Sequence, residues 1–478
     1  LLLLLLLLLL LLLLQPNTQL QCWGRGDLGR LGRGDDERDV GGNDNVTVYS
    51  NPILEFGSDP LNDILGDVWQ VAAGDDFTCV LLLDGSISCF GSNSLGQVGQ
   101  PVQTVPWTGN ATTVALNDTA VLVTAGAQSA CVITVSATIL CWGGYGDQRL
   151  VDNYVDVTVD GPLSIPLHGH TPSLLMMGAE HAVMIDAIDG DVFTWGIGGD
   201  GRLGHNNTND YTDGAEQAVY LGADVAATTA CAGRTHTCVA TTTGGVRCWG
   251  GGALALGSNG IETIGDDSSR SVASVDDVLF GAAVVQLACG SRHTCALLDD
   301  QHLRCWGAND VGQLGDGSNQ DVVSAAAAST SITSSDEHVL AVDAGNNFTC
   351  ALTYSDDPRY AVPQCTGAGT DGRTGQDGVG TLFAFAKVDV SRSVFMCFPT
   401  PSPTPPPTPV ARTAAATTMA AATAAGTTVA ANASAATTAA TTAAVAVPSA
   451  AGVAGGGDDG GDDAAARGGD GGRGVAAK

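Results

Sequence analysis

Short runs in which apolar residues alternate with polar ones recur along most of the chain. One run leads to a glycine, a second carries a cysteine, and a third follows a short turn and ends in Cys-Trp-Gly or a variant. Brief runs with a period of two, bounded by Gly, Asp and Ser, predict β-strands. No amphipathic helical pattern competes with them, so we expect an all-β protein.

The three-run unit is repeated. The segments Val285–Gly315 and Gln70–Gly99 share its pattern, and the cysteine position of the second run, here called the anchor, recurs every 47 to 57 residues. Repeats near this length with about four strands each form propeller blades. The sequence therefore predicts a seven-bladed β-propeller over residues 20–398. The seven anchors are Cys79, Cys131, Val183, Cys238, Cys295, Cys350 and Cys397.

The two ends of the repeat region complement each other. Gln21-Cys22-Trp23-Gly24 reads as a third strand without a second, and Val394–Cys397 reads as a second strand without a third. We expect them to form the seventh blade together, closing the ring with a Cys22–Cys397 bond.

The 14 cysteines contain no Cys-x-x-Cys motif, which disfavours zinc sites and favours disulfides. Residues equidistant from a hairpin turn face each other across the strands. The unit at Val183 has lost both cysteines together, with Thr194 at the second position, as a bonded pair predicts. For the remaining Cys231 and Cys289 we expect a bond between blades. The predicted hairpin bonds are Cys79–Cys89, Cys131–Cys141, Cys238–Cys248, Cys295–Cys305 and Cys350–Cys365.

The flanking segments have a different composition. Residues 1–19 open with fourteen leucines and read as a secretory signal, with a low-complexity artefact as the alternative. Residues 399–409 read as a polyproline II spacer. Residues 410–478, rich first in Ala and Thr and then in Gly and Asp, read as a disordered tail resembling a glycosylated stalk.

The charge of the chain limits its partners. Fifty acidic residues against 19 basic ones give a net charge of −31, which repels phosphates and anionic lipids. We therefore expect no nucleic-acid partner and no membrane insertion after signal removal. Among the glycosylation sequons we favour Asn110 and Asn117, in a long loop between blades. The sequons occur at Asn45, Asn110, Asn117, Asn206, Asn347 and Asn432.

Two motifs resemble those of the RCC1 repeat family. One pairs a glycine and a histidine before the second strand, as in Gly233 and His236. The other is Trp-Gly-x-x-x-x-Gly-Gln-Leu-Gly, best seen from Trp306 to Gly315. The resemblance implies the propeller fold, and the cysteine-rich form is similar to extracellular members. The name-giving member is a chromatin-bound exchange factor for a small GTPase, a role that the acidic composition and predicted disulfides disfavour.

The turns after the motif glycines are the candidate partner site, because they differ between blades and share one rim. We expect an acidic arc opposite a basic one, with ordinary solvated turns as the alternative. The histidines His181, His236 and His293 share one repeat position, which favours blade packing over a metal site. The rim residues are Asp75, Asp76, Gln128, Glu180, Arg234, Arg292 and Asn346.

No catalytic constellation or cofactor motif is found, so we expect neither enzyme activity nor a cofactor. The first hypothesis is a monomeric propeller, extracellular or at the cell surface, that binds a protein or a glycan. The alternative is a cytoplasmic exchange factor or GTPase-binding adaptor of the same repeat family.

Overall fold

The computed structural model describes most of the repeat region, and contacts divide the chain into residues 1–411 and residues 412–478. All described residues belong to the first unit. Of the segment expected to be a signal, only Gln19 is described; the spacer, the tail, Cys397 and Asn45 lie outside the described residues. The described residues are 19–34, 39–40, 54, 68–101, 106–144, 161–252, 256–257, 262–328, 337–356, 361–370, 373–376, 380–388 and 394–396.

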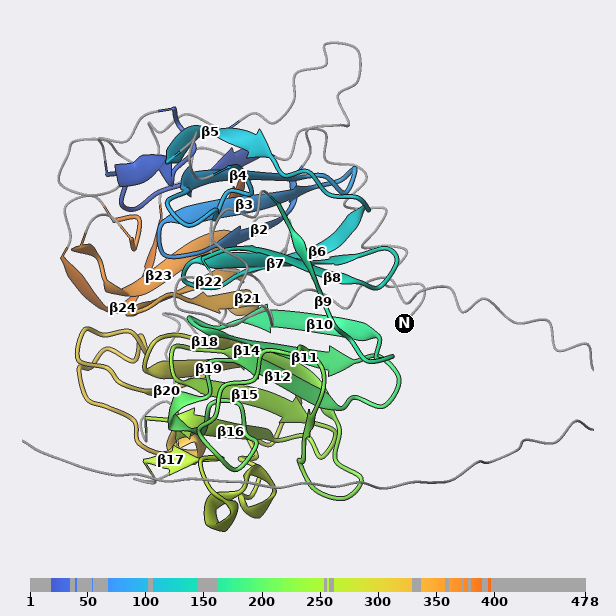
Figure 1. Cartoon of the computed structure of the whole chain (residues 1–478). Helices are drawn as coiled ribbons and strands as arrows, with labels where there is room; N and C mark the ends of the chain where they lie inside the picture. Colours follow the sequence, from blue (N-terminus) through green and yellow to red (C-terminus); the bar gives the residue numbers. More distant parts are fainter. Residues whose placement is uncertain are drawn as a thin grey trace, which may run out of the picture. The chain divides into compact units, whose positions relative to one another are not determined.

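Six antiparallel sheets follow one another along the chain and form the blades of an all-β propeller (Figure 1). Blade 1 comprises β2 (Val68–Ala73), β3 (Phe77–Leu82), β4 (Ile87–Ser92) and β5 (Trp107–Thr113). Blade 2 comprises β6 (Ala120–Ala125), β7 (Ser129–Thr134), β8 (Ile139–Gly143) and β9 (Leu163–Ile165). Blade 3 comprises β10 (Pro172–Met177), β11 (His181–Asp186), β12 (Val192–Gly196) and β13 (Ala218–Val219).

The second half of the ring repeats this plan. Blade 4 comprises β14 (Ala227–Ala232), β15 (His236–Thr241), β16 (Val246–Gly251) and β17 (Thr263–Ile264). Blade 5 has three strands, β18 (Val284–Cys289), β19 (His293–Leu298) and β20 (Leu303–Gly307). Blade 6 comprises β21 (His338–Ala344), β22 (Phe348–Tyr354), β23 (Val362–Ala368) and β24 (Thr381–Lys387).

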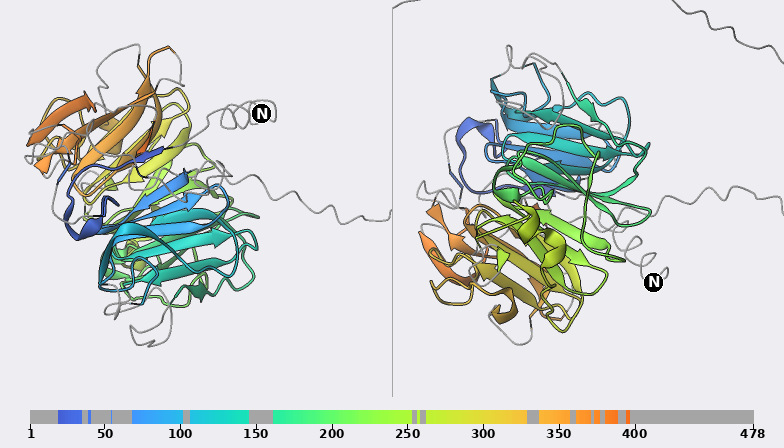
Figure 2. Two further views of the ribbon diagram at one scale, coloured as in Figure 1. Left: turned by 90° about the horizontal axis from the view of Figure 1, so that it is seen from above. Right: turned by 60° about the horizontal axis from the view of Figure 1, so that its bottom comes forward.

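The core lies between neighbouring blades. The innermost strands β2, β6, β10, β14, β18 and β21 contact one another in that order, which Figures 1 and 2 let the reader follow by colour. The tryptophans that end the third strands are fully buried. Trp249 Nε1 donates to the carbonyl of Arg202 in the preceding blade at 3.0 Å. The repeated tryptophan therefore packs one blade against another, as the sequence pattern indicates.

The structure corrects the predicted number of blades from seven to six. The terminal strands β1 (Gln19–Gln21) and β25 (Val394–Met396) do pair, but as a separate parallel two-stranded sheet. A second and a third strand of a blade run antiparallel, because a tight hairpin joins them. Strands from opposite ends of the chain lack that hairpin, so nothing local imposes the antiparallel direction.

The disulfides follow the strand register. All five predicted hairpin bonds are present, as is the bond between Cys231 of blade 4 and Cys289 of blade 5. In blade 3, Val183 stands opposite Thr194 in the register that the cysteines occupy elsewhere. Cys22 is also disulfide-bonded; the predicted bond partner, Cys397, lies outside the described residues.

Candidate functional site

A solvent-open cavity of about 290 Å³ lies where the innermost strands of the blades end. Its wall includes one motif glycine from each of the six blades, together with the residue that follows each glycine. The six glycines are Gly74, Gly126, Gly178, Gly233, Gly290 and Gly345.

Close approach explains why these positions are glycine. A Cβ on Gly178 would lie 2.5 Å from the carbonyl oxygen of Gly233 in the next blade and 2.7 Å from His181 Nδ1. A Cβ on Gly126 would likewise lie 2.5 Å from the Gly178 carbonyl oxygen. Contacts this short are not tolerated, so the glycines let the blades converge around the cavity.

The structure divides the predicted rim residues into two groups. Residues directly after a motif glycine line the cavity, and the predicted members of this inner group are Asp75, Arg234 and Asn346. Residues one position later lie beside the loops that follow the third strands. This outer group holds Asp76, Gln128, Glu180 and Arg292, whose carbonyls accept from backbone N–H groups of those loops.

Two arginines that the sequence reading missed neutralise part of the expected acidic arc. Arg30 Nη1 lies 2.8 Å from Asp76 Oδ1 and donates to the Asp75 carbonyl at 2.8 Å. Arg202 Nη1 lies 3.1 Å from Glu180 Oε2 and also donates to the carbonyl of Arg234. Both arginines occupy the glutamine position of the Trp-Gly repeat motif, and that departure from the motif was the available signal.

The basic arc is also partly paired. Arg292 Nη2 lies 2.9 Å from Asp310 Oδ2. Arg234 is exposed, and no described carboxylate lies within ion-pair distance of its guanidinium. Its charge is therefore the inner-group charge most available to a ligand.

Asp75 is the acidic group of the cavity. Asp75 is exposed, but partial desolvation by the surrounding wall raises the pKa of its carboxylate, and the neighbouring Asp76 raises it further. Asn346 Nδ2 lies 3.5 Å from Asp75 Oδ1, so a hydrogen bond links blade 6 to blade 1 across the cavity wall. The cavity wall thus presents a carboxylate, a guanidinium and an amide on turns of three different blades.

The three repeat histidines are buried in contacts between blades. His181 Nε2 lies 2.8 Å from Thr237 Oγ1, which itself donates to the Arg202 carbonyl at 2.9 Å. His293 and Thr349 repeat this arrangement with the Gln313 carbonyl. The threonine hydroxyl is committed as a donor, so the histidine must donate from Nε2.

Burial lowers the pKa of these histidines, to about 4 for His236 and about 3 for His293. Their Nδ1 atoms are buried without a hydrogen-bond partner, as is that of His181. Protonation would therefore create a buried, unpaired N–H. The neutral histidines are packing groups and are not gathered into a metal site.

Among the described residues, one group of side chains has the mutual spacing of metal ligands: Cys231, Cys238 and Cys289. All three are in disulfides, and a metal binds cysteine as the thiolate. The structure as it stands therefore offers no ligand set there.

Three of the described sequon asparagines lie at the surface, whereas Asn347 is half-buried. Asn110, Asn117 and Asn206 are exposed. Asn110 lies in the outer strand β5 and not in the long loop expected for it. The described part of the chain contains no helix long and apolar enough to cross a membrane.

Comparisons with known proteins agree with this geometry. A family model of the regulator of chromosome condensation (RCC1) repeat matches residues 70–97 and 284–313, and another matches residues 303–352. The ultraviolet-B receptor UVR8 of Arabidopsis thaliana is 26% identical over 320 residues, which is 64% of this chain and 64% of the receptor. The secretion-regulating guanine nucleotide exchange factor of Bos taurus is 27% identical over 57% of this chain and 62% of that protein.

The chain thus aligns with less than two thirds of either relative. Among solved structures, yeast RCC1 (Prp20) bound to Kap60 matches with a TM-score of 0.62 and 16% identity, covering 81% of this chain and 88% of that one. A likeness at this identity concerns the fold alone. The chain thus contains RCC1 repeats at residues 70–97 and 284–352, and its described residues fold as an all-β propeller of the RCC1 type.

Proposed function

We propose that this chain is an extracellular or cell-surface propeller that binds a protein or a glycan at its central cavity. The observation that carries the proposal is the exposed guanidinium of Arg234 on the cavity wall, which forms no ion pair with a described carboxylate, together with Asp75 on the same wall. Rigid turns that hold opposite charges give orientation and specificity to a bound partner. The disulfides favour an oxidising compartment.

A second candidate is an exchange factor or GTPase-binding adaptor inside the cell. The observation that favours it is the similarity to a protein named as a guanine nucleotide exchange factor. That similarity covers 62% of the relative, and fold alone does not carry function. We therefore rank it below the extracellular binding role.

Binding assays on the full chain distinguish the two. The chain is applied to arrays of extracellular proteins and glycans, and the affinity of each hit is measured for Arg234→Glu and Arg270→Glu. Arg270 lies in the connection between β17 of blade 4 and β18 of blade 5, pairs with Asp266 and Asp267, and does not line the cavity. Reversing the cavity charge should weaken binding about tenfold or more, while the Arg270 variant should bind as wild type.

Equal binding by both variants would place the partner elsewhere. The wild-type chain and both variants are also added to small GTPases loaded with a fluorescent GDP analogue, and release of the analogue is followed. Accelerated release by the wild-type chain would support the second candidate and contradict the first.

The compartment has its own measurement. Protein from the native source is alkylated before digestion, and the cysteine pairs are mapped by mass spectrometry. Intact hairpin pairs such as Cys295–Cys305 and occupied Asn110 or Asn117 are expected for a secreted chain. Uniformly alkylated cysteines would contradict the extracellular proposal.

A further inference from the structure

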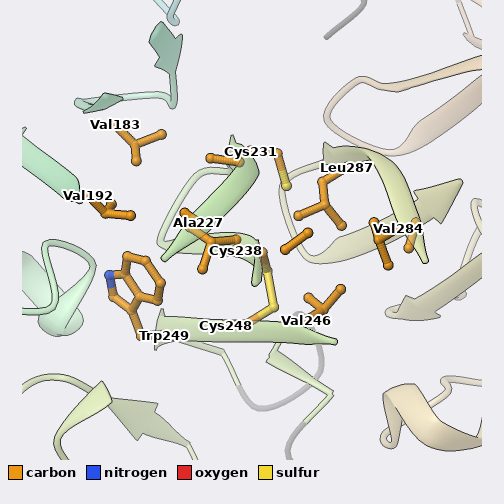
Figure 3. Packing of buried hydrophobic residues seen from close by; sticks show 14 of the residues in the cluster. Val183, Val192, Ala227, Cys231, Cys238, Val246, Cys248, Trp249, Val284 and Leu287 are labelled. Carbon is orange, nitrogen blue, oxygen red and sulfur yellow. A yellow bond between two sulfur atoms is a disulfide. The ribbon is translucent and has the colours of Figure 1, made fainter. Parts of the chain in front are cut away.

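Two disulfides lie side by side where blade 4 meets blade 5, one within blade 4 and one between the two blades. Cys231 stands opposite Cys238 in the register of β14 and β15, and Cys238 stands opposite Cys248 in that of β15 and β16. Cys231 is bonded to Cys289, and Cys238 to Cys248. The sulfurs of Cys231, Cys238 and Cys289 lie within 4.8 Å of one another, and Figure 3 shows Cys231 beside the Cys238–Cys248 bond.

This arrangement occurs in one blade among those described. The residue opposite the anchor on the innermost strand is Ala72 in blade 1, Thr124 in blade 2, and Ala288 in blade 5. Cys231–Cys289 is also the one described disulfide that joins two blades. Its two sulfurs differ in access, because Cys289 is half-buried and lines the central cavity, whereas Cys231 is 2% exposed.

We propose that Cys289 is a site of reversible modification by a small thiol that enters the central cavity. The thiolate attacks Cys289 Sγ, forming a mixed disulfide there and releasing the Cys231 thiolate. The thiolate attacks Cys289 and not Cys231 because Cys289 is the more accessible of the two, and access helps to determine which sulfur of a disulfide reacts. Of the two disulfides, the inter-blade bond is the one with a sulfur-bearing residue on the cavity wall, so it reacts first.

The released Cys231 thiolate then reacts with its neighbour. It is buried among apolar side chains, where an unpaired charge is costly. Attack on Cys238 Sγ forms a Cys231–Cys238 bond and releases the Cys248 thiolate, which takes a proton from water. A second thiol can reduce the mixed disulfide on Cys289, so two thiols leave as one disulfide and the protein gains thiols at Cys289 and Cys248.

The exchange unlinks blade 4 from blade 5 while the sheet keeps one disulfide. The bond that tied β15 to β16 is replaced by one that ties β14 to β15. The proposal concerns the chemistry of the cavity wall and holds whichever partner the propeller binds.

The test uses the full native chain and reduced glutathione as the probe. The chain is incubated with increasing glutathione, quenched with acid, alkylated, and digested with trypsin. Arg234 separates Cys231 from Cys238, and Arg247 separates Cys238 from Cys248. Each bond among Cys231, Cys238, Cys248 and Cys289 therefore joins distinct peptides.

We expect glutathione on Cys289, alkylated Cys248, and a cross-link between Cys231 and Cys238. These products should form at a glutathione concentration about ten times lower than that which opens any other hairpin bond. Reduction of another hairpin first, or alkylated Cys231 beside an intact Cys238–Cys248 bond, would overturn the proposal.

Two variants taken from other blades serve as controls. Cys238→Val with Cys248→Thr copies the Val183 and Thr194 pair of blade 3, and Cys231 should then be alkylated while Cys289 carries glutathione. Cys231→Ala with Cys289→Ala removes the point of attack, so Cys238–Cys248 should stay intact at the same glutathione concentration. Release of Cys248 in this second variant would contradict the mechanism.

Discussion

At the scale of single residues, the buried histidines couple the packing of neighbouring blades to proton binding. Each repeat histidine is hydrogen-bonded to a threonine of the next blade. For His181 and His293, that threonine donates to a loop carbonyl, so the histidine is the donor. Three of the blades use phenylalanine or serine at this position, including Phe77 and Phe348. The apolar ring fills the same space without a titrating group.

The lowered histidine pKa values predict a loss of stability in acid. The unfolded chain binds a proton near pH 6.5, whereas folded His293 binds one near pH 3, so the free energy of unfolding falls as pH drops through that interval. His293→Phe should remove roughly 3 kcal/mol of this loss at pH 4. Urea unfolding at pH 7 and pH 4 measures the free energy of unfolding. The control is His302→Phe, at an exposed histidine, which should lose as much stability between the two pH values as the wild-type chain. The same loss in His293→Phe would refute the prediction.

A motif glycine makes a second prediction at this scale. Gly178→Ala would place a Cβ 2.5 Å from the Gly233 carbonyl oxygen, and overpacking of this kind costs about 1–3 kcal/mol. Gly380→Ala is the matched control, because a Cβ there meets no atom within 4 Å. Thermal unfolding should separate the two variants, and equal midpoints would show that blades 3 and 4 can move apart at no cost.

At the scale of the strand pair, the repeat keeps one register whether or not a disulfide is present. The five hairpin bonds join residues with Cα atoms 4.1 Å apart. Val183 and Thr194 hold the same register in blade 3 without a bond. Packing and backbone pairing therefore set the hairpin, and the disulfide strengthens a geometry that already exists.

This predicts that blade 3 accepts the missing bond. Val183→Cys with Thr194→Cys should form a disulfide on oxidation and stabilise the chain by about 2–3 kcal/mol, mainly by restricting the unfolded state. Urea unfolding of the oxidised and reduced variant gives the difference. The single Val183→Cys variant is the control; a free thiol pair after oxidation would mean that blade 3 departs from the shared register.

At the scale of the whole propeller, contacts between blades determine how the ring closes, which the sequence of a single repeat does not specify. Six blades surround the cavity, Asn346 of blade 6 lies against Asp75 of blade 1, and β1 pairs with β25 in parallel. The closure of the ring thus depends on residues far apart in the sequence.

The predicted Cys22–Cys397 bond is testable by a double-mutant cycle. Cys22→Ser and Cys397→Ser should each lower the free energy of unfolding, by up to about 5 kcal/mol for so long a loop. The double variant should lose little more than either single one, because both remove the same bond. Additive losses would show that the two cysteines do not pair.

The sequence by itself determined the strands, the blade repeat and the hairpin disulfides. Each of these depends on alternation, turn residues and cysteine spacing within about fifty residues, so a single unit encodes it. The register that joins Cys295 to Cys305 can be counted from Asp300 alone.

Only the tertiary structure decided the number of blades and the composition of the candidate site. Asp75 and Asp76 are adjacent in the sequence, yet one lines the cavity and the other meets Arg30. The close approach of the Cys231, Cys238 and Cys289 sulfurs likewise arises where two blades meet. These features depend on which surfaces of neighbouring units face each other, and no pattern within one unit specifies that.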